Sequence, residues 1–590
     1  MKNLHLILLF LTFSSVSLLG QNWQKASVHE DYTITTEEFI PNSILEERDG
    51  AGFNQLSGFP FGGRANPNFK NFRNVTVVDL NGDQKDDILL GFDNRLRAYT
   101  DEGLLWEKTL SGFIVYPPSV ADINDDGELD IVQTTGSING TGRIYLLDKE
   151  GNTQTGWPLN FDGNWILTAA ALADLNDDNQ LEIIFVERRS PSGRIHAVQF
   201  DGSSFGGSWP VTLDATPAVT PSVGDVDGDN AVEVVVNSTE SRYVIQANGQ
   251  LEAGFPIKTH PERRYSFQSP ILVDLNDDQA LEIIGATHGD NMDPKPEFYV
   301  MEGDGTNYPG WPKPIAEDSW TFNTPTVLPL DGGHQIFMSR PIGDEENKDV
   351  LFGWDGGGTA LPGFPIRKNG GLEGIITVAD VDNDDEFELV FGSNTIDAEG
   401  NGFINAYEMD GQTEVANFPI RPKGWTFMNG ANFGDVNGDG KMDLIALTYT
   451  QTFGAGVDSV FLNVYDLNVP IATEDVLWGT YKGSNTRDGR LPEMVILNSE
   501  DVGKEKLDWK VIPNPMQDIG LISAVIEQST YSRVTLLDVN GKKIRTIFEG
   551  QLGKGAHQLP IETGALSAGI YLLSWESNEG RSVRKLVINR

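Results

Sequence analysis

Short apolar runs recur along most of the chain, and polar turns rich in Asp, Asn and Gly separate them. Residues 88–90 (Ile-Leu-Leu), 183–185 (Ile-Ile-Phe) and 234–236 (Val-Val-Val) follow such turns, and similar runs precede them, as at 75–78 and 375–378. Short runs rich in β-branched residues and bounded by turn residues are typical of buried strands. The pattern therefore predicts a repeated unit of strand, polar loop and strand.

Two further elements complete each unit. A third strand is predicted at residues 143–148, 194–198, 242–245, 298–301, 403–407 and 461–465. A fourth element ends in an aromatic residue followed by proline, at Trp157-Pro158, Trp209-Pro210, Phe255-Pro256, Trp311-Pro312, Phe364-Pro365 and Phe418-Pro419. Because proline cannot donate to a strand ladder, we expect the fourth strand at the outer edge of each sheet.

The polar loop between the first two strands repeats one acidic spacing, with oxygen side chains at loop positions 1, 3, 5 and 9. Seven copies occur: Asp79-Asn81-Asp83-Asp87, Asp122-Asn124-Asp126-Asp130, Asp174-Asn176-Asp178-Glu182, Asp225-Asp227-Asp229-Glu233, Asp274-Asn276-Asp278-Glu282, Asp380-Asp382-Asp384-Glu388 and Asp435-Asn437-Asp439-Asp443. Successive copies lie about fifty residues apart, a period typical of propellers and solenoids. One interval spans two periods, and residues 326–338 stand where the missing copy would be.

This spacing favours calcium. Oxygens at positions 1, 3 and 5, a backbone carbonyl at 7 and a carboxylate beyond can surround a hard cation that takes six to eight oxygen ligands. No Cys or His takes part, which argues against zinc and copper. We expect up to seven structural calcium ions. Position 6 needs a sharp turn and holds Gly127, Gly440, Asn179 and Asn230 in four loops, whereas Gln84 and Gln279 predict the two weakest sites.

Eight units of four antiparallel strands predict an eight-bladed β-propeller, with seven blades as the alternative. The Gly-Phe-Pro-Phe sequence at 58–61 resembles the fourth-strand phrase but precedes the first loop. We expect it to form the outer strand of the last blade and so to join the ends of the ring. The competing candidate is the segment 476–481, around Trp478.

Composition limits the function. The chain of 590 residues has 86 acidic and 43 basic residues and a net charge of −43. An acidic surface argues against nucleic acid as a partner. Without metal the acidic loops repel themselves, so we expect folding and calcium binding to be coupled. Cysteine is absent, so metal loops take the stabilising role that disulfides have in many exported proteins.

The start of the chain indicates export. Lys2 and the apolar residues 4–13 precede small residues up to Gly20, which predicts a cleaved signal peptide at 1–20 and an N-terminal extension at 21–52. The apolar run is too short to span a membrane, and no later stretch is long enough. We therefore expect no transmembrane segment in the mature chain.

The acidic units resemble FG-GAP repeats of the VCBS class, the integrin-like calcium-binding propeller blades. The resemblance covers about residues 53–490, and the sixth unit departs from it because it lacks the acidic loop. It implies a propeller in which the metal loop joins the first two strands of each blade and calcium is structural.

The tail differs from the repeats. After a polar linker at 491–506, residues 507–590 predict a small β-sandwich with strands at 521–526, 532–538, 543–548, 569–575 and 582–588 and a turn at Asn540-Gly541. The phrases at 512–515 (Ile-Pro-Asn-Pro), 538–542 and 585–588 resemble the C-terminal sorting domain of the type IX secretion system. That resemblance implies transport through the periplasm and across the outer membrane by the secretion machinery, with a secreted or surface-anchored product. An additional adhesive sandwich is the alternative.

A ligand site is predicted near the entrances to the first strands, where aromatic rings and basic residues gather. The candidates are Trp165, Arg263, Arg264, Tyr265, Trp320 and Trp425, with Lys423 beside them. Such platforms suit an extracellular polysaccharide or protein; alternatively the rings wedge between blades. No nucleophile or metal-ligand motif involves the seven histidines, and no catalytic residue is assigned. A calcium-dependent polysaccharide lyase is the alternative function.

Overall fold

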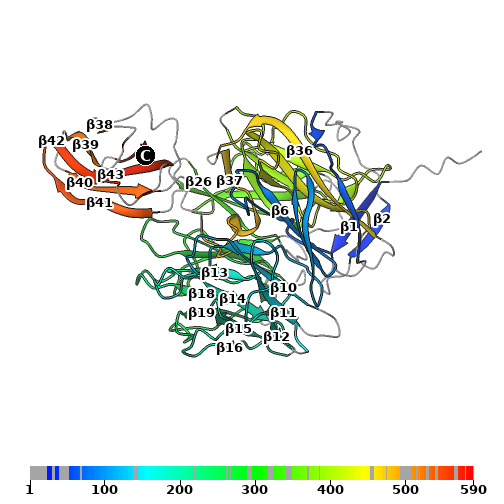
Figure 1. The fold of residues 1–590 in the computed structure, drawn as a ribbon. Helices are drawn as coiled ribbons and strands as arrows, with labels where there is room; N and C mark the ends of the chain where they lie inside the picture. Colours follow the sequence, from blue (N-terminus) through cyan, green and yellow to red (C-terminus); the bar gives the residue numbers. More distant parts are fainter. Residues whose placement is uncertain are drawn as a thin grey trace, which may run out of the picture.

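The computed structural model is built of strands (Figure 1). It describes residues 23–28, 34–38, 52–66, 70–136, 142–161, 163–189, 191–217, 219–260, 263–265, 267–288, 296–315, 323–330, 333–339, 348–368, 371–384, 386–451, 458–472, 475–491, 508–512, 516, 519–526, 530–537, 543–563, 566, 569–577 and 580–588. The predicted signal peptide, most of the linker and Trp320 lie outside these residues. Within them no helix is long and apolar enough to cross a membrane.

Sheets one to four follow one another along the chain and share one strand order. They consist of β5 (Thr76–Val78), β6 (Asp87–Phe92), β7 (Arg95–Thr100) and β8 (Gly103–Thr109); β9 (Ser119–Ala121), β10 (Asp130–Thr135), β11 (Gly142–Leu147) and β12 (Leu159–Phe161); β13 (Ala171–Ala173), β14 (Glu182–Glu187), β15 (Arg194–Val198) and β16 (Val211–Thr212); and β17 (Ser222–Gly224), β18 (Glu233–Asn237), β19 (Ser241–Gln246) and β20 (Ile257–Lys258). All neighbouring strands pair antiparallel.

Sheets five to eight keep this plan with additions. They consist of β21 (Arg264–Tyr265), β22 (Ile271–Val273), β23 (Glu282–His288), β24 (Glu297–Met301) and β25 (Lys313–Pro314); β26 (Thr326–Leu330), β27 (Gly333–Ser339), β28 (Lys348–Asp355) and β29 (Ile366–Lys368); β30 (Ile376–Ala379), β31 (Glu388–Gly392), β33 (Ile404–Glu408) and β37 (Val476–Trp478); and β34 (Asn432–Gly434), β35 (Lys441–Tyr449), β36 (Asp458–Pro470), β3 (Asn54–Gln55) and β4 (Phe61–Ala65). This series of antiparallel sheets is consistent with a propeller.

The fourth strands lie at the sheet edge, as expected, but they begin after the aromatic-Pro pair instead of ending in it. β12 starts directly after Trp157-Pro158 and pairs with β11. Before the proline, Thr153 forms a single bridge to Leu147. The proline therefore interrupts an edge strand. At an edge no neighbouring strand needs the N–H that proline lacks.

The N-terminal strand β4 belongs to the last sheet. It pairs antiparallel with β36 over residues 61–65, which confirms the expectation for the Gly-Phe-Pro-Phe sequence. The competing candidate β37 pairs instead with β30 of sheet seven. Sheet eight also contacts sheet one, because Asp86 N–H donates to the Asp435 carbonyl at 2.8 Å and Asp435 N–H to an Asp86 carboxylate oxygen at 2.8 Å.

The segment after β37, here called the inner segment (residues 479–490), crosses the first strands of several sheets. Backbone N–H groups of Val120, Leu172, Val223 and Leu272 donate in turn to its carbonyls at 485, 486, 488 and 489, at 2.8–2.9 Å. The Arg487 guanidinium is fully buried and donates to the Tyr481 carbonyl at 2.7 Å and to Thr76 Oγ1 at 2.9 Å. Burial lowers the pKa of Arg487 to about 9. One continuous segment therefore ties sheets one to five together.

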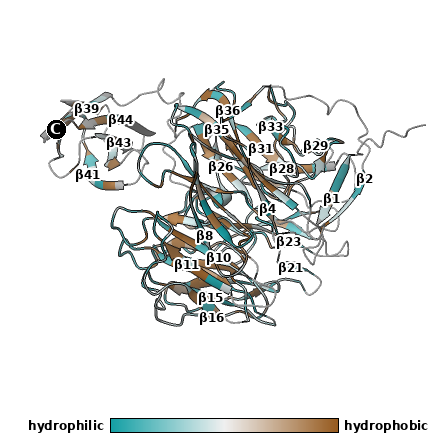
Figure 2. Cartoon of the chain, turned by 45° about the vertical axis from the view of Figure 1, so that its right-hand side comes forward, coloured by the Kyte–Doolittle hydropathy of each residue, from teal (hydrophilic) through white to brown (hydrophobic). Residues whose placement is uncertain are grey.

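Apolar residues on neighbouring sheets pack against each other, and the strands of the repeated sheets are largely brown in Figure 2. A hydroxyl-to-carbonyl hydrogen bond also links successive sheets: Thr76 to Pro118 at 2.7 Å, Ser119 to Ala170 at 2.6 Å, Ser222 to Pro270 at 2.7 Å and Thr326 to Ile376 at 2.8 Å. Because the same strand supplies this bond in each case, the stacking of sheets is regular.

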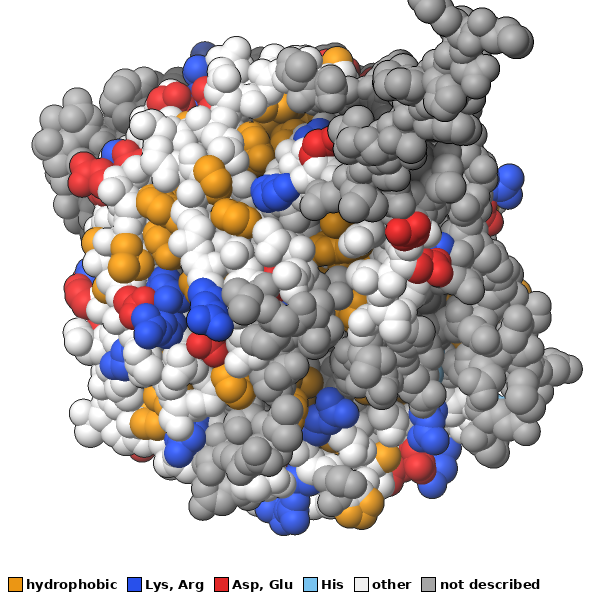
Figure 3. Space-filling view, turned by 90° about the vertical axis from the view of Figure 1, so that its right-hand side faces the viewer, with side chains coloured by type: hydrophobic (Ala, Val, Ile, Leu, Met, Phe, Trp, Pro, Cys, Tyr) orange, Lys and Arg blue, Asp and Glu red, His pale blue; other side chains and the backbone are white. Residues whose placement is uncertain are grey.

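Two parts flank the repeated sheets. The hairpin of β1 (Gln24–Val28) and β2 (Ile34–Glu38) pairs with β32 (Thr395–Ile396), which follows β31, and the three strands form a separate sheet. On the face shown in Figure 3, basic, acidic and apolar side chains are interspersed among the described residues.

The C-terminal residues form two sheets around a core of their own, on one side of the described chain (Figure 1). β38 (Asp508–Ile512), β39 (Ile519–Ile526) and β42 (Gly555–Glu562) make one sheet, and β41 (Lys543–Leu552), β40 (Thr530–Leu537), β43 (Gly569–Ser577) and β44 (Gly580–Ile588) make the other. The five predicted strands are present, β38 and β42 were missed, and the Asn540-Gly541 turn lies outside the described residues. The apolar residues of β42 alternate weakly, so its sequence gave little signal.

Candidate metal loops and the opposite end of the sheets

Each acidic loop joins the first and second strands of its sheet, and one hydrogen bond recurs at its base. A carboxylate oxygen at position 9 accepts the backbone N–H of position 2 in all seven copies. The donors are Leu80, Ile123, Leu175, Val226, Leu275, Val381 and Val436, at 2.6–3.4 Å. The repeated spacing in sequence is therefore a repeated geometry.

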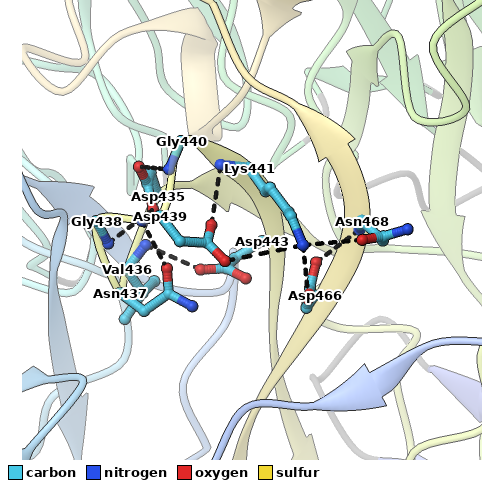
Figure 4. Close-up of polar contacts among 10 residues, drawn as sticks. All are labelled: Asp435, Val436, Asn437, Gly438, Asp439, Gly440, Lys441, Asp443, Asp466 and Asn468. Atoms are coloured by element: carbon cyan, nitrogen blue, oxygen red, sulfur yellow. Dashed lines mark hydrogen bonds and ion pairs between the residues drawn. The ribbon is translucent and has the colours of Figure 1, made fainter.

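Figure 4 shows the rest of the pattern in the loop 435–443. Asp435 accepts the N–H groups of Gly438, Asp439 and Gly440 at 2.8–3.1 Å, and Asp439 accepts the N–H of Lys441 at 3.0 Å. The bond from position 7 to the position 5 carboxylate is present in every loop. These bonds orient the carboxylates of positions 1 and 5 before any ligand binds.

Position 6 has a left-handed backbone in the six loops where this residue is described, as the sequence predicted. The φ angle is 88° at Gly127 and 76° at Gly440, and also 69° at Gln84 and 79° at Gln279. Non-glycine residues pay a steric cost in this region, least for Asn and Asp. Weaker binding by the two Gln loops stays a prediction.

The loops combine an exposed rim with a buried base. Position 5 is exposed in every loop, whereas the position 9 side chains are between 0% and 5% exposed. Burial raises the pKa of every position 9 carboxyl: to about 6 for Asp87 and Asp130, about 7 for Glu182, Glu282 and Asp443, about 8 for Glu233 and about 9 for Glu388. A buried carboxylate without a compensating charge is costly.

Two position 9 groups have an oxygen that makes no hydrogen bond. Glu388 Oε1 and Asp443 Oδ1 are buried and unpartnered, while the second oxygen of each accepts the position 2 N–H. In sheet four, ligand oxygens of Asp225, Asp227 and Asp229 lie within 4.8 Å of one another, and so do those of Asp380, Asp382 and Glu388 in sheet seven. Clustered hard oxygen donors with an unsatisfied buried oxygen fit a calcium ion.

Sequence reasoning missed Glu408. Its carboxylate lies with Asp382 and Asp384 in a third group whose oxygens are within 4.8 Å of one another. Glu408 belongs to β33 and pairs directly with Glu388 of β31. Burial raises its pKa to about 7, and neighbouring acidic groups add to the shift. Aligning the third strands on the residue that pairs with loop position 9 could have identified Glu408.

The predicted ligand residues lie at the opposite end of the second strands from the metal loops. Trp165 is half-buried and bridges Arg188, which follows β14. Tyr265 and Trp425 are only 4% and 2% exposed, so they pack inside the sheets and do not form an exposed platform. Tyr265 lies edge-on to Tyr299, with 6.2 Å between ring centroids, and Trp425 contacts Phe427 in the same way at 5.9 Å.

The basic candidates differ in accessibility. Arg263 Nη1 pairs with Glu297 Oε1 at 2.6 Å and is 14% exposed. Arg264 and Lys423 are exposed at the same end of the sheets. The half-buried Trp165 and the exposed Arg264 and Lys423 therefore lie at this end of the sheets. The Tyr265 and Trp425 rings are covered.

Family models match two parts of the chain. The FG-GAP-like repeat matches residues 122–185, which span the second loop and the third. The secretion system C-terminal sorting domain matches residues 510–589. Among curated proteins, none matches the chain by sequence.

Solved structures resemble the chain only loosely. BBS1N in complex with ARL6DN shares 12% identity over 70% of this chain and 97% of that chain, with a TM-score of 0.36. The biofilm matrix protein Bap1 of V. cholerae shares 14% identity over 90% of this chain and 86% of that chain, with a TM-score of 0.31. The Neurospora crassa Pan2 WD40 domain shares 13% identity over 60% and 90%, with a TM-score of 0.30. At these scores no argument rests on the likeness.

The sorting domain indicates export to the cell surface or the extracellular space and engagement of the secretion machinery. The loops, strands and tail agree with both family models. The chain is therefore a secreted or cell-surface β-propeller-like protein with an FG-GAP-like repeat and a type IX secretion C-terminal sorting domain.

Proposed function

We propose that the protein is an eight-bladed, calcium-stabilised propeller, exported by way of its signal peptide (residues 1–20) and its sorting domain. Its domains are the extension 21–52, the propeller 53–490, the linker 491–506 and the sorting domain 507–590. Closure of the ring is supported by the pairing of β4 with β36 and by the contacts between β34 and β5. The inner segment would occupy the centre of this ring.

The observation that carries the calcium proposal is the buried, unpartnered oxygen of Glu388 and of Asp443 at the base of loops that share two recurring hydrogen bonds. In each loop the residues at positions 1, 3, 5 and 9 would hold the ion. A bound divalent cation supplies positive charge to carboxylates that otherwise stand close together in a low-dielectric base. The role of calcium here is stability, because the loops fix the hairpins of successive sheets.

Calcium binding is tested by counting ions on the full chain with native mass spectrometry and by melting with and without chelator. We expect up to seven ions per chain and a lower melting temperature in chelator, because ligands that bind only the folded state stabilise it. No bound calcium, or an unchanged melting temperature after complete removal, would refute the proposal. Magnesium at equal concentration is the control ion.

We further propose that the end of the sheets opposite the metal loops binds an extracellular polysaccharide or protein. The exposed cations Arg264 and Lys423 and the half-buried ring of Trp165 support this assignment. A glycan array tests it with the calcium-loaded protein, the variant Arg264→Ala and the control Lys149→Ala. Lys149 lies at the metal-loop end of sheet two, where its ammonium pairs with Glu128 of the loop 122–130. Equal binding by both variants would exclude Arg264 from the site.

A further inference from the structure

We propose that Glu408 is a fifth carboxylate ligand of the divalent cation held by the loop 380–388. The inference rests on the proposed calcium binding of the loops. It adds a ligand from outside the loop, on the third strand of sheet seven, and so gives one site a different affinity from the others.

The geometry brings this ligand to the loop. Two groups of carboxylates overlap at Asp382, one with Asp380 and Glu388 and the other with Asp384 and Glu408. In each group the ligand oxygens lie within 4.8 Å of one another. Because the two groups share Asp382, the five carboxylates lie next to one another at the loop end of sheet seven.

A second observation points to a cation at that place. Glu388 is 0% exposed, one of its oxygens accepts the Val381 N–H at 2.7 Å, and Oε1 makes no hydrogen bond. A buried carboxylate oxygen left without a partner is costly, and a coordinated cation satisfies it. Because Glu388 and Glu408 are register partners on adjacent strands, the same ion reaches both.

Equivalent positions in two other sheets lack this arrangement. Gln246 stands opposite Glu233 in sheet four and donates to Glu252 Oε2 at 2.8 Å. Asp466 stands opposite Asp443 in sheet eight, and the Lys441 ammonium lies 3.8 Å from its carboxylate. Gln246 is therefore neutral and Asp466 already faces a cation, whereas Glu408 faces Asp382 and Asp384.

The charge count predicts how this site behaves. Sheet four has four loop carboxylates and a neutral Gln246, so Glu408→Gln would give sheet seven the same composition. Because affinity rises with the number of charged ligands, the ion in sheet seven should be the last to leave as free calcium falls. Without an ion, five neighbouring carboxylates repel one another more than four do.

The experiment compares the full chain with the variants Glu408→Gln, Asp382→Asn and Glu386→Gln. Glu386 is the matched control: it is exposed in the same loop and lies outside both carboxylate groups. Native mass spectrometry counts bound calcium at a series of buffered free concentrations. We expect the last ion to leave Glu408→Gln at about tenfold higher free calcium than it leaves the unmodified chain and Glu386→Gln. Asp382→Asn should affect the same ion, which assigns it to this loop.

Melting in chelator gives an independent readout. Glu408→Gln should melt no lower than the unmodified chain without calcium, and lower with saturating calcium, whereas a merely structural role would lower both. The proposal is overturned if Glu408→Gln and Glu386→Gln release their last ion at the same free calcium, or if Asp382→Asn leaves that ion unaffected. Failure of the calcium proposal itself looks different, because the unmodified chain would then bind no calcium at all.

Discussion

Sheet six and sheet seven follow the same strand plan but connect their first two strands differently. In sheet seven four residue pairs join β30 to β31, and the acidic loop 380–387 follows β30. In sheet six five residue pairs join β26 to β27, and the last of them pairs Leu330 with Gly333. A short hairpin with a longer ladder therefore takes the place of the metal loop.

Sheet six keeps three other features of its neighbours. Thr326 Oγ1 still donates to the carbonyl of Ile376 in the next sheet, and Val327, Ile336 and Phe337 are fully buried in the core. Its edge strand β29 still follows an aromatic-Pro pair. The strand plan is therefore kept without an acidic loop, through packing between sheets.

Chelation should separate the two kinds of sheet most clearly. Removing calcium is expected to lower the stability of the protein by about 3 kcal/mol for each occupied site when calcium is a hundredfold above its Kd. Hydrogen exchange should increase at Leu80, Val226 and Val436, whose N–H groups bond the position 9 carboxylates. Val327 and Ile336 of sheet six should change least. Equal increases of hydrogen exchange in sheet six and in the loop-bearing sheets would contradict a difference between them.

A core substitution in sheet six should act independently of calcium. Phe337 is fully buried and lies 5.5 Å from the Phe364 ring, so Phe337→Ala should cost about 3–5 kcal/mol. Denaturant unfolding in calcium and in chelator should give the same loss. Glu388→Gln is the contrasting variant, and it should be costly in calcium alone. A calcium-dependent cost for Phe337→Ala would contradict this view of sheet six.

The pH dependence should come from the loop-bearing sheets. In the calcium-free protein burial raises the pKa of Glu388 to about 9 and of Glu233 to about 8. The folded state therefore holds these protons more tightly than the unfolded state, and this stabilisation is full below the unfolded pKa and lost as pH rises through the folded pKa. Unfolding in chelator should show a loss on the order of 2 kcal/mol from each of these two groups between pH 6 and pH 8. Glu388→Gln should reduce the slope, and an unchanged slope would exclude Glu388 as a source.

The smallest effect should come from turn geometry within the loop-bearing sheets. Gln84 has a φ of 69°, so Gln84→Gly should stabilise the protein by about 1 kcal/mol. Gln180, one position further along its own loop, is the control, and Gln180→Gly should be neutral or destabilising because no strain is relieved there. Thermal unfolding measures both. A gain for the two variants alike would indicate an effect unrelated to φ.

The tertiary structure corrected the sequence interpretation where distant contacts decide. The aromatic residues at 265 and 425 occupy equivalent places before the first strands, and their spacing alone suggested an exposed ring of aromatic side chains. Tyr299 lies against Tyr265, and Trp425 packs in a core cluster that includes Ile88 and Val460, which are distant in sequence. Glu408 was missed for the same reason, since it approaches the loop only through the register of β31 with β33.

By itself, the sequence determined the strand units, the acidic loops with their position 6 turns and the sorting domain. These depend on short spacings and on phrases a few residues long, which local backbone geometry converts directly into structure. The tertiary structure decided where the segment after β37 runs, which rings are covered and which carboxylate joins the loop of sheet seven. Each depends on contacts between residues far apart in sequence, and burial and register set those contacts only when the sheets pack together.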